Sequence, residues 1–225
     1  MEELLGVQGK KARDGGNKGS AIGIATKKAV QFAMSNSSSR VAFMQFMESS
    51  EFDASLREKI LKNDARLADS MIYSVQKLES VTKMFLSSDV KSIGLTNLDN
   101  NRLPKGEAFV VDGITLLRLP VTASGATPTA DEIKKATSIA WKGITGDATA
   151  VLTLKAHKRE IVSDLPCYAF INADNVQVSH YSLENPRLIK DEGEIEAELM
   201  MPTMSGVPAN TYVMLILTGT RVIPK

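Results

Sequence analysis

The stretch TYVMLILTGTRVI, at residues 211–223, decides the fold of this chain. It is rich in the β-branched, aromatic and aliphatic residues that are enriched in strands. The stretch is apolar on both faces through Leu217, which is typical of a central strand or of one whose outer face packs on another subunit. A long apolar edge left bare invites aggregation. We therefore expect this strand in the middle of a sheet, in a protein built for assembly.

A second stretch, residues 193–200, alternates strictly between acidic and apolar side chains. Its two faces are Glu194, Glu196 and Glu198 on one side and Ile195, Ala197 and Leu199 on the other. Successive side chains of a strand point to opposite faces of a sheet. We therefore expect a strand with one buried face and one acidic face that meets water or a basic partner.

Turn residues divide the rest of the C-terminal two thirds into further strands. Two strands are expected between residues 71 and 86, and the other candidates are 90–97, 107–119, 149–157, 166–173 and 176–184. Turn signals such as Pro104-Lys105-Gly106 and Asn185-Pro186 separate them. This punctuation predicts a mainly β domain over residues 70–225, folded as an antiparallel β-sandwich of jelly-roll type.

One helical insertion is expected inside this domain. Thr129 and Glu132 have the spacing of a capping box, and apolar residues follow at helical spacing. The pattern predicts a short helix over about 129–141, in a loop between strands.

Residues 1–69 are expected to form a basic, flexible N-terminal arm and short helices. Up to Arg40 the chain holds seven bases and three acids, and residues 9–20 are too poor in apolar groups to fold alone. Apolar residues at helical spacing predict a helix over about 22–32, which the serines of residues 35–39 end. A second helix is expected after Ser50, with Phe52, Leu56 and Ile60 on one face.

Composition excludes several classes of protein. The 225 residues carry 27 basic and 26 acidic side chains, so the whole chain is no polyanion binder. A single cysteine, Cys167, excludes an internal disulfide framework and a cysteine-based zinc site. The start lacks the apolar run of a signal peptide, and no apolar stretch approaches the roughly 20 residues that span a bilayer. We expect a chain made in soluble form.

No group of residues has the pattern of a catalytic or cofactor-binding site. The glycine cluster at residues 15–20 lacks the spacing of a phosphate-binding loop. His157 and His180 lack partners at ligand spacing, and Cys167 lies in an expected apolar strand, where a buried, inert thiol is the usual state. We therefore expect no catalytic residue, no metal, no cofactor and no enzymatic activity.

The expected strands carry two groups of short motifs. The first group is GLTNLD at residues 94–99, LPKG at 103–106 and FVVDGI at 109–114. The second is LENPRLI at 183–189, VPANTY at 207–212 and LTGT at 217–220. Over about residues 70–225 these motifs resemble the early and closing strands of single jelly-roll major capsid proteins of tailless icosahedral bacteriophages.

The resemblance implies a structural virion protein that self-assembles into an icosahedral capsid shell around the genome. It implies a homo-oligomer joined through the sides of the sandwich, made in the host cytoplasm, with minor capsid or vertex proteins as further partners. It also implies that the basic arm faces inward, toward genome phosphates or internal lipid. The candidate contact residues are Lys10, Lys11, Arg13, Lys18, Lys27 and Lys28.

A soluble carbohydrate- or ligand-binding β-sandwich is the alternative interpretation. Such a module gathers aromatic and polar residues on a few loops. This chain holds only one Trp, four Tyr and seven Phe, which favours assembly.

Overall fold

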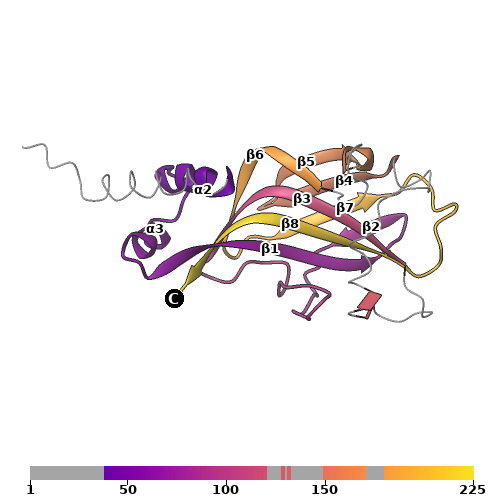
Figure 1. Ribbon diagram of the computed structural model, residues 1–225, viewed down its shortest axis with the longest axis horizontal. Coiled ribbons are helices and arrows are strands. Elements are labelled where there is room, and N and C mark those ends of the chain that lie inside the picture. The colour runs from indigo at the N-terminus through magenta and orange to yellow at the C-terminus, as the bar shows by residue number, and fades with distance from the viewer. Residues whose placement is uncertain (1–37, 121–127, 130, 133–148, 171–179) are drawn as a thin grey trace, which may run out of the picture.

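Two antiparallel sheets pack face to face in this protein (Figure 1). The computed structural model describes residues 38–120, 128–129, 131–132, 149–170 and 180–225. Within that part of the chain, eight strands form sheets of order β1-β8-β3-β6 and β2-β7-β4-β5. Their bounds are β1 Ala65–Lys77, β2 Val81–Met84, β3 Ala108–Pro120, β4 Val151–Ala156, β5 Arg159–Pro166, β6 His180–Lys190, β7 Ile195–Met200 and β8 Thr211–Pro224.

The strand order is that of a jelly roll, so the expected fold class is confirmed. The chain changes sheet at every connection except the β4–β5 hairpin, and the first strand pairs with the last. Eight strands arranged in two Greek keys define this architecture.

The expected central position of the 211–223 stretch is also confirmed, because β8 pairs with β1 on one side and β3 on the other. Its inward side chains Val213, Leu215 and Leu217 are fully buried, whereas Met214 and Ile216 on the outer face are half-buried. On β7, Ile195 and Leu199 are fully buried and Ala197 nearly so, which confirms the predicted alternation.

A glycine fixes the close approach of the two central strands. A Cβ added to Gly219 would lie 1.9 Å from the backbone oxygen of Val110. Atoms of two residues cannot approach so closely, so only glycine fits there. The register of β3 against β8 shifts beside this contact, between Val111 and Gly113.

Two helices, α2 at Ser38–Glu48 and α3 at Ala54–Leu61, cover one end of the β1-β8-β3-β6 sheet (Figure 1). They form a second apolar core with the sheet, in which Phe43 and Phe52 meet edge to face at 5.4 Å between ring centroids. Val110 and Val222 of the central strands belong to this core. Met44 and Met47 of the N-terminal region thus pack here, each 2% exposed.

The helices differ from the expected ones in two respects. Helix α2 was not expected and begins at Ser38, within the serine run, whereas the helix expected over about 22–32 lies outside the described residues. The cap of α3 is Asp53 rather than Ser50: its carboxylate accepts a hydrogen bond from the backbone N–H of Leu56 at 2.8 Å. Phe52 and Leu56 are buried as predicted.

Three expectations about strands were wrong. Residues 90–97 form only isolated bridges, at Ser92 and Thr96, because this segment serves as a cover for the edge of β1. The strand expected from residue 166 lies earlier, as β5, and Cys167–Phe170 form a 3-10 turn, η1. The turn expected at Asn185-Pro186 lies within β6, where the pairing with β3 skips from Ser182 to Arg187.

The capping box is present. Thr129 N–H and Oγ1 both donate to Glu132 Oε2 at 2.9 Å, and Glu132 N–H donates back to Thr129 Oγ1. The rest of the expected 129–141 helix lies outside the described residues. The domain boundary expected near residue 70 lies inside β1, which begins at Ala65.

Candidate functional site

The two histidines and the cysteine hold structural positions. His157 lies in the two-residue β4–β5 turn at a positive φ of 51°, and its Nε2 accepts a hydrogen bond from the backbone N–H of Lys190 at 2.9 Å. Burial, together with the nearby Lys190 charge, lowers the pKa of His157 below its ordinary value of 6.5. His180 Nδ1 lies 2.9 Å from Thr115 Oγ1, and Cys167 is fully buried.

These residues do not converge on a reaction centre. Among the described residues no group of three or more His, Cys, Asp or Glu side chains could hold a metal ion. Within the same part of the chain, no helix has both the length and the apolar character needed to cross a membrane. Two surfaces of the sandwich carry exposed charged or apolar side chains.

The first such surface is a hollow of about 530 Å³ on the outer face of the β2-β7-β4-β5 sheet. Its charged lining holds five carboxylates and two ammonium groups: Glu160, Asp164, Glu194, Glu196, Glu198, Lys83 and Lys155. We call this surface the acidic hollow. The register places these charges in rows, with Lys83 and Thr153 on either side of Glu198, and Lys155 beside Glu196.

Partners neutralise the acidic hollow only in part. Glu194 forms an ion pair with Arg102 at 2.5 Å, and Glu160 one with Lys155 at 3.4 Å. Glu196 and Glu198 have no ion pair within the structure's described ranges. Exposed pairs of this kind contribute little stability, typically under about 1 kcal/mol. The predicted acidic face of residues 193–200 is therefore present, and most of its negative charge stays open.

Asn101 lines the acidic hollow and is 4% exposed. Its side-chain oxygen Oδ1 is buried without a hydrogen-bond partner. Most buried polar atoms in native proteins have a partner, so each exception calls for an explanation such as a bound group. Asn101 was expected only as a turn residue, and its positive φ of 53° agrees with that role.

The second surface is one side of the sandwich, along the edge strands β1 and β2. Among the described residues, six large apolar side chains are exposed, and all but Tyr168 lie on or beside these two strands. They are Met71 at 59%, Val81 at 45%, Val90 at 73%, Ile93 at 102% and Met200 at 39%. Alternation along the strands places Met71 on the outer face of the β1-β8-β3-β6 sheet, and Val81 and Met200 on the outer face of the other sheet. We call the segment that carries Val90 and Ile93 the β1–β2 side. Val90 and Ile93 lie in the segment between β2 and β3, which runs along β1 (Figure 1).

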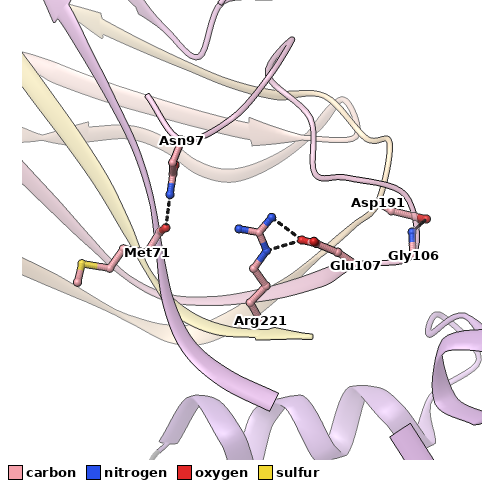
Figure 2. A network of polar contacts seen from close by, with 6 residues as sticks. All are labelled: Met71, Asn97, Gly106, Glu107, Asp191 and Arg221. Atoms are coloured by element: carbon pink, nitrogen blue, oxygen red, sulfur yellow. Dashed lines mark hydrogen bonds and ion pairs between the residues drawn. The ribbon is translucent and has the colours of Figure 1, made fainter. Parts of the chain in front are cut away.

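That segment covers the backbone edge of β1. Asn97 donates from Nδ2 to the backbone oxygen of Met71 at 2.7 Å (Figure 2). Its Oδ1 accepts from the backbone N–H of Tyr73 at 2.9 Å. Val75 N–H donates to the backbone oxygen of Leu95 at 2.8 Å. Between Met71 and Val75 the edge of β1 is thus occupied and cannot add a strand from another chain. Contacts along this part of β1 would use exposed side chains.

Polar contacts hold the start of β3 to the neighbouring strands and turns (Figure 2). The Asp191 carboxylate accepts from the backbone N–H of Gly106 at 2.7 Å, and Arg221 pairs with Glu107. Both side chains of the Arg221–Glu107 pair are 15% exposed. The Arg221–Glu107 pair is thus shielded from water. Together with the Asp191–Gly106 contact, it holds the C-terminal end of the segment that carries Val90 and Ile93, where the segment enters β3.

All six basic residues predicted to contact genome or lipid lie outside the described residues, so that interpretation stays a prediction. The exposed apolar residues were not predicted as a surface, because residues 90–97 were expected in a strand. Asn97 and Asn101 gave no signal in the sequence beyond that of ordinary strand and turn residues.

No family model matches this chain, and no curated protein matches it. Among solved structures, it is similar to one described as the acidic stable capsid structure of Helicobacter pylori bacteriophage KHP30. The match has 12% sequence identity and a TM-score of 0.32, and it covers 72% of this chain and 94% of the other. A match at that level assigns neither a family nor a function.

Proposed function

We propose that this chain is a structural virion protein that self-assembles into an icosahedral capsid shell around a viral genome. The copies join through the sides of their jelly rolls, without catalysis. The proposal rests on the surface of this chain and not on its similarity to the bacteriophage capsid.

The placement of exposed apolar side chains carries the proposal. Val90 and Ile93 lie on the β1–β2 side, and Ile93 is as exposed as a free side chain. Burying one aliphatic side chain contributes about 1.5–3 kcal/mol. A neighbouring copy placed against this side would remove both groups from water at once.

The opposite edge of the same sheet differs in character. There, β6 carries Pro186 and an irregular pairing with β3, two features that blunt a sheet edge. The apolar side of one copy would meet a surface unlike itself on the next copy. Such head-to-tail contacts close into rings when the rotation between copies allows it.

The alternative, a carbohydrate- or ligand-binding module, has less support. Sugar sites place exposed aromatic rings beside polar groups. The one aromatic residue lining the acidic hollow in the described part of the chain is Phe85, which is 2% exposed. Tyr168 is well exposed but does not line the hollow.

The test is light scattering behind size exclusion, with electron microscopy of the fractions, across a salt series on the full chain. We expect shells, rings or discrete multimers. Val90→Asp combined with Ile93→Asp should abolish them and leave the melting temperature unchanged, because both side chains are exposed in the single chain. Ile93→Val keeps an apolar group at the same place and serves as the matched control.

One outcome would refute the shell, and another would refute the contact through the β1–β2 side. A strict monomer at every salt concentration would favour the ligand-binding module. Unchanged particles from the double aspartate variant would show that the β1–β2 side is not the contact.

A further inference from the structure

His157 connects the two sheets at one end of the sandwich. It lies in the turn between β4 and β5, whereas Lys190 is the last residue of β6 in the other sheet. The backbone N–H of Lys190 donates to Nε2 of His157 at 2.9 Å. Because β5 and β6 are the edge strands of their sheets, this hydrogen bond joins the sheets on the side where both end.

The ring of His157 fits closely against the turn between β6 and β7. A Cβ added to Gly193 would lie 1.8 Å from Cε1 and 2.1 Å from Nδ1 of the ring. Atoms of two residues cannot approach so closely, so only glycine leaves room for the ring. The backbone N–H of His157 also donates to the backbone oxygen of Glu194 at 2.9 Å. The ring is therefore held in one position, with Nε2 toward Lys190.

The direction of this hydrogen bond makes it sensitive to protonation. A backbone N–H can only donate, so Nε2 of His157 must be free of a proton, and the neutral ring carries its proton on Nδ1. A charged imidazole has a proton on both nitrogens and accepts no hydrogen bond. Protonation of His157 would thus replace the acceptor of the Lys190 N–H by a second donor.

Three charged side chains act on the ring from the elements around it: Lys190 from β6, Arg159 from β5 and Asp191 from the β6–β7 turn. Burial disfavours the charged ring, as do the charges of Lys190 and Arg159, whereas Asp191 favours it. The net result is a pKa of His157 below its ordinary value of 6.5. The hydrogen bond therefore persists near neutral pH and is lost only in acid.

Other contacts keep the β6–β7 turn in place when this bond is lost. The Asp191 carboxylate accepts from the backbone N–H of Gly106 at 2.7 Å. The backbone N–H of Glu192 donates to the backbone oxygen of Leu103 at 3.1 Å. Both contacts tie the turn to the segment before β3. Loss of the His157 bond would therefore free the β4–β5 turn from β6 without moving the β6–β7 turn.

We propose that His157 is an acid-sensitive latch between the two sheets, which opens when its ring takes up a proton. The β4–β5 turn then separates from the end of β6. Ala156 and Ile189 lie one residue before His157 and Lys190 and are buried in the core between the sheets, so the opening would admit water to that end of the core. The latch belongs to the single chain and does not depend on the proposed shell.

The test is hydrogen exchange of the full chain over a pH series, followed by mass spectrometry, which suits assembled and unassembled protein alike. Exchange of the Cε1 proton of His157 reports protonation of the ring. Exchange of the Lys190 amide, corrected for the rate in a free peptide at each pH, reports the hydrogen bond. We expect both to change with one midpoint below pH 6.5. Protection of Lys190 should fall about threefold to tenfold, the value for one hydrogen bond.

The series ends at about pH 4.5, above the ordinary pKa values of about 3.9 for Asp and 4.3 for Glu, so that carboxylates stay ionised. Matched variants then assign the effect. His157→Gln offers an oxygen that accepts from the Lys190 N–H and does not titrate, so Lys190 should stay protected at every pH. His157→Asn suits the positive φ at this position but is shorter, and it should leave Lys190 unprotected at every pH. His180→Gln removes the other histidine of the chain and should keep the response of the natural protein.

Three outcomes would overturn the latch. Protection of Lys190 that stays constant while His157 titrates would show that the bond does not depend on the ring. A His157 ring that stays neutral to the end of the series would remove the trigger. A response that persists in His157→Gln and disappears in His180→Gln would assign it to the other histidine. None of these results bears on the shell, which fails only if the chain does not assemble.

Discussion

Leu215 offers the sharpest test of the jelly roll, because its neighbour on the same strand provides the control. Leu215 is fully buried between the sheets, opposite Leu116 on β3 and Ser74 on β1. Replacing a buried leucine by alanine costs about 2–5 kcal/mol, part of it from the cavity left behind. Ile216 points to the outer face and is half-buried. Ile216→Ala should therefore lower the free energy of unfolding by only about 1 kcal/mol, because the methylene groups that it removes are only partly buried.

The measurement is urea unfolding of the unassembled full chain, followed by far-ultraviolet circular dichroism. A urea slope of about 1–3 kcal/mol per molar turns the expected loss for Leu215→Ala into a midpoint lower by about 1 M or more. Leu215→Asp would bury a charge and lose several kcal/mol. Equal losses for Leu215→Ala and Ile216→Ala would show that the faces of β8 are assigned wrongly.

Two further predictions concern single contacts. The lowered pKa of His157 means that, as pH falls below 6.5, the unfolded chain binds a proton before the folded one does. The contribution of neutral His157 to the free energy of unfolding is therefore complete above pH 6.5 and is lost as pH falls toward the pKa of the folded state. His157→Gln should flatten the dependence of the melting temperature on pH. An unchanged slope would exclude His157 as the source of that dependence. Asn97→Ala removes two hydrogen bonds from the edge of β1 and should cost about 1–3 kcal/mol in the urea assay. A loss below a few tenths of a kcal/mol would show that water replaces both bonds.

The sequence predicted those elements whose burial follows a simple period. In β7 and β8 one face is fully buried, so hydrophobic alternation or a continuous apolar run identified them. The pattern of buried and exposed side chains along β5 follows no such period, because β5 is an edge strand whose pairing with β4 contains bulges. Pro186 has the local signature of a turn, but an edge strand with an irregular pairing accommodates it.

Of the candidate site, only the acidic row on β7 could be predicted. The other carboxylates of the hollow come from β5, which the sequence pattern did not reveal. Asn97 and Asn101 depend on contacts with residues distant in the chain, Met71 and Ile195 among them, and local patterns carry no such information. Exposure of Val90 and Ile93 likewise follows from the edge of β1 being already occupied.

The position of β8 has a consequence for synthesis. This strand lies between β1 and β3 in space, yet it follows both in the chain, and Ala65 pairs with Pro224. During synthesis, β1 and β3 therefore cannot form their sheet until β8 has been made. Until then, their unpaired edges are open to other nascent chains. Contacts between residues so far apart in sequence make folding slow. The chain is most exposed to misassembly in that interval, and chaperones would act there.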